Sequence, residues 1–217
     1  MCIRDSPGKK EMESRASDIE TIVFDMGGVI LKSNKLAVIE QLARDAGKSL
    51  ELTQERFQSA QAQEIMCQWE MGSVDDAFAI HSLASQIEVE ETDFRRALSN
   101  LFSLNEEIVP LVESWASKYR IVLASNSPHF VAQYVRREFE IFDLFDAFVF
   151  SYDIGARKPA LEFLEHLATT VGGVASDRTL FVDDNAKNIS AARSVGFTAL
   201  QYRNAVSLQL EFGSIGS

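Results

Sequence analysis

Three aspartates stand at the ends of two apolar segments and could bind a metal ion together. Asp183 and Asp184 end or follow the apolar run 179–182, and Asp25 follows the run 21–24. Adjacent carboxylates repel each other and resist desolvation, so a cation is expected close to them. Magnesium suits such a site because it takes one or two carboxylates and keeps several waters. Since strand ends line the ligand crevice of an open parallel α/β sheet, the sequence predicts a magnesium site there.

The composition is that of a globular chain and argues against two classes of partner. The 217 residues are 46% hydrophobic and 24% charged, which allows a sizeable core. The formal net charge of −11, without a long basic block, disfavours nucleic acid and anionic membranes as partners. No apolar stretch has transmembrane length, and Cys2 and Cys67 have no metal-binding spacing. We expect a cytoplasmic protein, either a monomer or a homodimer.

The N-terminal residues 1–19 are expected to form a disordered polar tail. Residues 1–6 resemble translated sequencing-adapter sequence, and Met12 is a plausible native start. Residues 1–11 are therefore interpreted as an artefact and excluded from the argument on the fold.

Beyond the tail, apolar segments of strand length alternate with helical patterns. Several segments are nearly continuous apolar runs, as in strands that are covered on both faces. Ser127 followed by Pro128 is typical of a helix start, and Gly196 of a helix end. The pattern predicts an α/β fold with a doubly wound, parallel, Rossmann-like sheet. The expected strands are 21–25, 120–124, 147–151, 179–183 and 198–202, and the expected helices between them are 128–139, 160–170 and 186–195.

Only helical signals occur between the first two predicted strands. Ser73 to Asp76 resembles a capping box, and Thr92 could cap a later helix. We expect an all-helical cap domain, residues 33–104, inserted into an α/β core of residues 20–32 and 105–217. Because the cap follows Asp25 directly, it could close over a site at the strand ends.

Four motifs in this order resemble those of the haloacid dehalogenase-like hydrolase superfamily. Any one motif is a weak signal, but four in order on the expected elements are specific. The segment 69–78 also resembles the helical cap of that superfamily's first cap class, and the resemblance covers residues 20–202. The Gly-Gly-Val-Ile form is most similar to the glucose-1-phosphatase-like branch and to the phosphatase domains attached to epoxide hydrolases. The motifs are Asp25-Met-Gly-Gly-Val-Ile30, Ser125-Asn126, Lys158-Pro159 and Phe181-Val-Asp-Asp-Asn185.

The resemblance implies a role for each motif residue. Asp25 would be the nucleophile that forms an aspartyl-phosphate, assisted by Ser125 and Lys158. Asn188 would orient Lys158 or the metal shell. Taken singly, most of these residues are more often turn, cap or solvated residues. The implied substrate-binding residues are Gly27, Gly28, Ser125, Asn126 and Lys158, and the implied magnesium ligands are Asp25, the Gly27 carbonyl, Asp184 and, through water, Asp183.

Gly27 departs from the phosphatase pattern. The family's phosphatases usually carry a second Asp at this position to protonate the leaving group, and such a group contributes roughly 10²–10⁴-fold in rate. The predicted function is a magnesium-dependent phosphohydrolase that acts on a small phosphorylated metabolite, with a sugar phosphate among the candidates. Two alternatives stay open: a haloacid dehalogenase-type hydrolase, and a catalytically weakened binding or regulatory protein.

Overall fold

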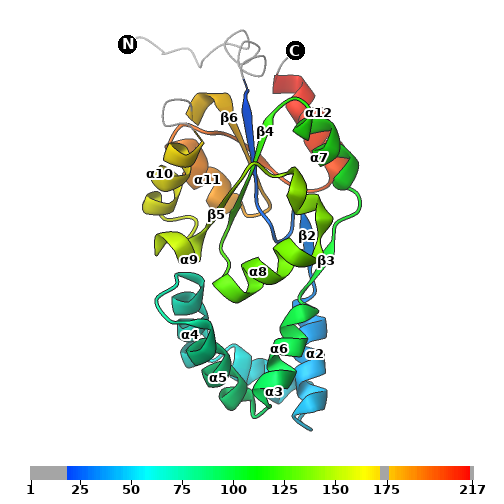
Figure 1. Cartoon of the computed structure of the whole chain (residues 1–217), viewed down its shortest axis with the longest axis vertical. Coiled ribbons are helices and arrows are strands. Elements are labelled where there is room, and N and C mark those ends of the chain that lie inside the picture. Colours follow the sequence, from blue (N-terminus) through cyan, green and yellow to red (C-terminus); the bar gives the residue numbers. More distant parts are fainter. Residues whose placement is uncertain (1–18, 172–175, 216–217) are drawn as a thin grey trace, which may run out of the picture.

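The computed structural model describes residues 19–171 and 176–215, so residues 1–18 of the expected tail lie outside the described residues. One parallel sheet forms the centre, with strand order β5-β4-β1-β6-β7 (Figure 1). All five strands expected from the sequence are confirmed to within one residue at each end. Their bounds are Thr21–Phe24 (β1), Arg120–Ser125 (β4), Ala147–Phe150 (β5), Thr179–Asp183 (β6) and Thr198–Gln201 (β7).

Successive residues of the strands pack into two different cores, which makes the sheet doubly wound. Ile22 and Phe24 of β1 belong to one core, and Val23 belongs to the other. In Figure 1, α7 and α12 lie on one side of the sheet, and α10 and α11 on the other. The helices of the first core are α7 (Val109–Ala116), α8 (His129–Glu138) and α12 (Ala205–Ile215), and those of the second are α10 (Leu161–Thr170) and α11 (Ala186–Ser194). Short connections are η2 (Glu140–Leu144), α9 (Ser151–Ile154) and η3 (Ser176–Arg178).

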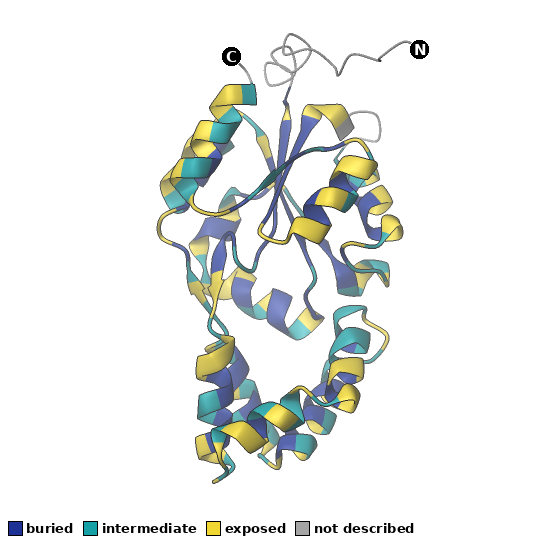
Figure 2. Ribbon diagram, turned by 180° about the vertical axis from the view of Figure 1, so that it is seen from behind, coloured by how far each residue is buried: buried dark blue, intermediate teal, exposed yellow. Residues whose placement is uncertain are grey.

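The helical insertion has a core of its own. Trp69, Phe94 and Ile80 are among its fully buried side chains, and Figure 2 shows buried residues both in these helices and around the sheet. The helices are α2 (Lys35–Asp45), α3 (Leu50–Phe57), α4 (Ala60–Glu70), α5 (Asp76–Ile87) and α6 (Glu91–Ser99). We call residues 35–99 the cap. We propose that the inserted domain as a whole comprises residues 33–104, between core segments 20–32 and 105–217.

A two-stranded antiparallel ribbon carries the chain into and out of the cap. It pairs β2 (Leu31–Ser33) with β3 (Phe102–Leu104), in the register Leu31 with Leu104 and Ser33 with Phe102. These two strands are not recognisable in the sequence, because three residues are too few to show an alternating pattern. The ribbon starts only a few residues after Asp25, so it joins the cap directly to the end of β1.

Three helix starts differ from the sequence expectation. The side chain of Asp75, rather than Ser73, caps α5 by accepting a hydrogen bond from the Phe78 amide at 2.7 Å. Helix α6 begins after Glu90 rather than after Thr92. Helix α8 begins at His129, with Pro128 in the N-cap position instead of the first helical turn. Several neighbouring residues at each place have capping chemistry, and tertiary contacts decide among them.

The expected end of α11 is confirmed. Gly196 follows the helix with φ 97°, a left-handed conformation that a residue without a Cβ adopts at little cost. Among the described residues, no helix is both long and apolar enough to cross a membrane.

The aromatic packing around β1 leads to a stability prediction. Phe24 is fully buried, and its ring lies 6.0 Å from the Trp115 ring and 6.3 Å from the Phe145 ring, centroid to centroid. Phe24→Ala should lower the free energy of unfolding by about 3–5 kcal/mol, because it removes buried contacts and leaves a cavity. Urea unfolding measures the change. Phe78→Ala is the matched control, since Phe78 is 53% exposed and should shift stability by only about 0.5 kcal/mol. Equal losses in the two variants would contradict this assignment of the core.

Candidate active site

The register of β1 and β6 brings the predicted carboxylates together. Phe24 pairs with Val182, and the Asp25 amide donates to the Val182 carbonyl at 2.8 Å. Asp25 and Asp183 therefore reach the same edge of the sheet, with Asp184 beside them. One oxygen from each of the three carboxylates lies within 4.8 Å of the others. Asp25 and Asp183 are buried and Asp184 is exposed, so the group borders the crevice that the sequence predicted.

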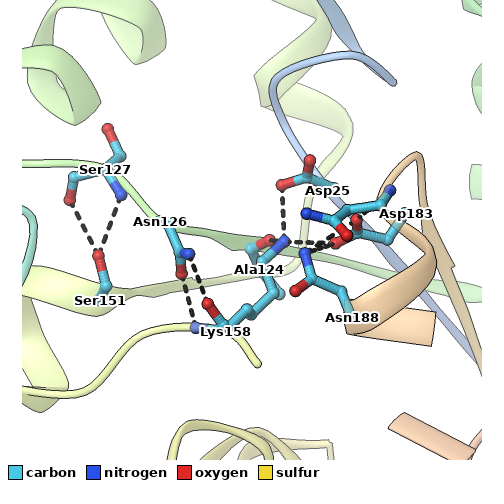
Figure 3. Close-up of polar contacts among 9 residues, drawn as sticks. Asp25, Ala124, Asn126, Ser127, Ser151, Lys158, Asp183 and Asn188 are labelled. Carbon is cyan, nitrogen blue, oxygen red and sulfur yellow. Dashed lines mark hydrogen bonds and ion pairs between the residues drawn. The ribbon is translucent and has the colours of Figure 1, made fainter. Parts of the chain in front are cut away.

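The ammonium of Lys158 joins two of these carboxylates (Figure 3). Its Nζ lies 2.7 Å from Asp25 Oδ1, 2.7 Å from Asp183 Oδ2 and 2.7 Å from the Ala124 carbonyl oxygen. An ammonium has three N–H donors, so these contacts use all of them. Three carboxylates against one ammonium leave two negative charges when all four groups are ionised. A divalent cation would balance that charge.

Burial and mutual repulsion shift the pKa values of these groups. Burial, opposed by Lys158 and reinforced by the charge of Asp183, raises the pKa of Asp25 to about 6. Burial and then the charge of Asp183 also raise the pKa of Asp184. Burial alone would lower the pKa of Lys158, but Asp25 and Asp183 together raise it above its ordinary value. Lys158 is therefore a fixed positive charge, and the carboxylates still lack sufficient positive charge around them.

Asp183 is held in place by hydrogen bonds from α11 and the turn before it. The Asn188 side-chain amide lies 3.0 Å from both carboxylate oxygens of Asp183, and the Asn185 backbone amide donates to Oδ1 at 2.9 Å. With Lys158 on Oδ2, both oxygens already accept bonds from the protein. The structure thus places Asn188 on Asp183 instead of on Lys158, and it leaves Asp25 and Asp184 as the carboxylates more open to an ion.

The turn after β1 approaches Asp184 very closely. Gly28 has φ 88°, and a Cβ on it would lie 2.2 Å from Asp184 Oδ2. The Gly28 amide donates to the Leu31 carbonyl at 2.7 Å, and the Leu31 amide donates to the Met26 carbonyl at 2.8 Å, which keeps the turn tight. Only glycine fits this position, because any side chain would displace the carboxylate. The all-oxygen donors, the charge of minus two and this close backbone fit a hard divalent cation such as Mg²⁺.

Gly27 differs from Gly28 in its surroundings. It does not have the positive φ of Gly28, and a Cβ on it would lie 3.4 Å from the Phe102 ring. The position of the family's second aspartate is therefore bordered by an aromatic ring from β3.

Ser125 ends β4 and Asn126 follows it, next to this group. Ser125 is 2% exposed, and both residues line the cavity in front of the carboxylates. The Asn126 side chain donates to the Lys158 carbonyl at 2.9 Å and accepts from the Lys158 amide at 2.8 Å (Figure 3). Its amide thus positions the Lys158 backbone. All residues that the sequence singled out for the site are brought to this one place.

The cavity has a volume of about 420 Å³ and lies between the strand ends and the cap. This volume falls in the range of small-molecule sites. The sequence analysis missed the residues that close the cavity on the cap side, because helices α2, α4 and α6 gave only a core pattern. Those residues are Lys35, Met66, Trp69, Glu70, Leu98 and Leu101, joined by Phe102 of the ribbon and Arg157 of the core.

Polar contacts also fasten α4 and α5 of the cap to the core. The Glu70 carbonyl accepts a hydrogen bond from the Ser151 hydroxyl, and the Glu70 carboxylate forms an ion pair with Arg157 at 3.0 Å. Asp76 accepts from Trp69 Nε1 at 2.7 Å within the cap and from the Phe130 amide at 3.1 Å in the core. The cap is therefore attached on two sides, by the ribbon and by these contacts.

Comparison with known proteins identifies the family. Residues 19–196 match the model of the haloacid dehalogenase-like hydrolases, and the chain belongs to that family of enzymes. It is 28% identical over 193 residues to the sesquiterpene phosphatase AstK of Aspergillus oryzae, a match that covers 87% of this chain and 92% of that protein. It is 23% identical over 201 residues to the D-ribitol-5-phosphate phosphatase of Bacteroides thetaiotaomicron, covering 89% and 96%.

A solved structure shows the same fold. It is that of a haloacid dehalogenase-like family enzyme from Bacteroides thetaiotaomicron, which matches with a TM-score of 0.79 and 20% identity over 89% of this chain and 98% of that one. The same enzyme in complex with magnesium and inorganic phosphate matches with a TM-score of 0.75 over 86% and 95%.

The contact between Gly28 and Asp184 predicts an effect on metal affinity. Gly28→Ala should weaken Mg²⁺ binding at least about tenfold, because the new methyl group would push the Asp184 carboxylate aside. Isothermal titration calorimetry on the folded variant measures the affinity. Gly155→Ala is the control: Gly155 has φ 74° but nothing within 4 Å of a Cβ, so it shares the backbone strain without the collision. Equal affinities in the two variants would show that Asp184 does not hold the ion.

Proposed function

We propose that the protein is a magnesium-dependent phosphohydrolase that acts on a small phosphorylated metabolite through an aspartyl-phosphate on Asp25. The observation that carries this proposal is the arrangement around Lys158. Its ammonium fixes Asp25 Oδ1 at 2.7 Å, while the cluster with Asp183 and Asp184 keeps a charge that calls for a divalent cation. A buried carboxylate that is oriented by a cation at one oxygen can attack with the other.

The residues divide the chemistry between them. Asp25 Oδ2 would attack phosphorus, and the bond from phosphorus to the alcohol oxygen would break, with the alcohol taking a proton from water. Water would then attack phosphorus, break its bond to Asp25, and release inorganic phosphate and the free carboxylate. Asp25, Asp184 and the Gly27 carbonyl would hold Mg²⁺, with Asp183 acting through water. The bound ion would supply positive charge to the phosphoryl oxygens.

The phosphoryl group would be bound by the ends of β1 and β4. Ser125 would donate its hydroxyl, and the main chain at Gly28 and Asn126 would complete the contacts. Because all three donors of Lys158 are already engaged, its part would be to neutralise charge on Asp25 and the transferring group instead of adding a separate hydrogen bond.

The relatives support the class of reaction and span two kinds of substrate. One is named for a sesquiterpene substrate and the other for D-ribitol 5-phosphate. The crystallised neighbour that binds magnesium and inorganic phosphate is consistent with the proposed cofactor and product. A sugar phosphate remains one candidate within the class of small phosphate esters.

A haloacid dehalogenase is a weaker alternative for this site. Asp25 could attack carbon, but that reaction needs no metal, and the paired charges of Asp183 and Asp184 would then have no use. A binding or regulatory role is motivated by Gly27, which removes the family's usual acid. The polar geometry around Asp25 is nevertheless complete enough for attack on a substrate with a good leaving group.

Asp25→Asn tests the proposed nucleophile. The amide keeps the size of the side chain but removes the attacking charge, so magnesium-dependent turnover of phosphate esters should fall at least about 10³-fold. Covalently bound phosphate that is labile to alkali should also disappear from the protein. Asp143→Asn, at an exposed position in η2, is the control and should keep both signals. Wild-type labelling of Asp25→Asn would place the nucleophile elsewhere.

Gly27→Asp tests the missing acid. An aspartate here should accelerate esters with poor leaving groups, such as alkyl phosphates, by about 10–100-fold and aryl phosphates far less. The backbone permits the change because Gly27 lacks a positive φ, although the Phe102 ring must move slightly. The measurement is the dependence of kcat/KM on leaving-group pKa, with kcat and KM followed separately. An unchanged slope in a folded, metal-binding variant would reject the missing-acid account.

A further inference from the structure

We propose that the alcohol released by this enzyme is a hydrocarbon alcohol rather than a polyol. The inference rests on the proposed function and narrows its substrate class. It follows from which cavity walls are apolar and from how the polar groups of the cavity are already used.

Part of the cavity wall is formed by apolar side chains from four segments. Met66 comes from α4, Leu98 from α6, Leu101 and Phe102 from the entry into β3, and Val131 from α8. Met66, Leu101 and Phe102 are only partly buried, so they keep surface that a ligand could cover. A hydrocarbon group that covers this surface gains binding free energy in proportion to the apolar area that is removed from water.

Several polar groups of the cavity already have partners within the protein. The indole N–H of Trp69 donates to Asp76, and the carboxylate of Glu70 is paired with Arg157. The Asn126 amide is bonded to the Lys158 main chain at both its nitrogen and its oxygen. A polyol would bring several hydroxyls into this space, and each one that lost water without gaining a partner would weaken binding.

Lys35 lines the same cavity as Asp184, as do the polar residues Ser33 and Arg157. A cation there favours the phosphoryl group, which is anionic, over an uncharged alcohol. The cavity thus combines charged groups for the phosphoryl part of a phosphate ester with apolar walls for its alcohol part.

The surroundings of Gly27 also favour a hydrocarbon alcohol. In place of an acidic side chain, the Phe102 ring borders this position, 3.4 Å from where a Cβ would lie. The atoms next to the bond that breaks would therefore meet an aromatic surface instead of a carboxylate. An alkyl or prenyl group buries apolar area against such a ring, whereas a polyol must also remove water from hydroxyls that find no partner there.

A chain-length series tests the proposal at nearly constant leaving-group pKa. With ethyl, butyl, hexyl and octyl phosphate, kcat/KM should rise about 2- to 4-fold per methylene until the cavity is full. Glycerol phosphate and ribitol 5-phosphate should be poorer substrates than butyl phosphate. In parallel, calorimetry with the corresponding alkylphosphonates in the presence of Mg²⁺ should show affinity rising with chain length, and this readout does not depend on turnover.

Two variants locate the apolar surface, and a third controls for the type of change. Met66→Gln and Leu101→Asn should each flatten the dependence on chain length by at least about twofold per methylene in both readouts. Met71→Gln makes the same exchange just after α4, outside the cavity lining, and should keep the wild-type slope. Thermal melts of the three variants confirm that they remain folded.

The outcomes separate this inference from the proposed function. Magnesium-dependent turnover that is flat with chain length, or that favours the polyol phosphates, would overturn the hydrocarbon class and leave the phosphohydrolase intact. Phosphonate affinity that rises with chain length without turnover of any ester would support the apolar pocket and overturn the hydrolytic function. Unchanged slopes in both Met66→Gln and Leu101→Asn would overturn the assignment of the surface.

Discussion

The buried ammonium of Lys158 is the interaction on which the site depends. It binds Asp25 at the end of β1, Asp183 at the end of β6 and the Ala124 carbonyl in β4, so one side chain connects three neighbouring strands. Two carboxylates could not share this dry position without it, because each would repel the other. The Asn126 amide fixes the main chain of Lys158, and Asn188 fixes Asp183. These charged groups are thus held together at the strand ends by a connected set of ion pairs and hydrogen bonds.

The cap adds walls to this centre, and one cap residue, Lys35, also brings a positive charge to the cavity. Its contacts with the core are of two kinds. Glu70 and Asp76 make polar contacts with Ser151, Arg157 and the start of α8, and Phe130 of α8 packs against the hydrophobic core of the cap. Arg157 directly precedes Lys158, so the position of the cap and the position of the ammonium are linked through adjacent residues. In the proposed function, the strand ends carry the chemistry and the side chains of α4, α6 and β3 select the alcohol.

The sequence was sufficient to predict the sheet and the charged group, because both are recognised from patterns of residues that are close together in the sequence. Continuous apolar runs marked the strands, and Asp25 and Asp183 stood directly at their ends. The parts that it missed depend on distant partners. Asp76 was interpreted as a capping residue, yet its carboxylate bonds the Phe130 amide, 54 positions away. The three-residue strands β2 and β3 exist only because they pair with each other across the whole cap, so neither could be recognised alone.

That ribbon has a consequence for how the family can diversify. Since Leu31 pairs with Leu104, the insertion leaves and re-enters the core at adjacent points. The ribbon holds the two ends of the insertion together. The entropic cost of closing a loop grows only slowly with its length, so the helices beyond the ribbon can be lengthened, shortened or exchanged at little cost. Exchange of the helical segment beyond the ribbon would therefore change the walls of the cavity without rebuilding the strands that carry the charged group.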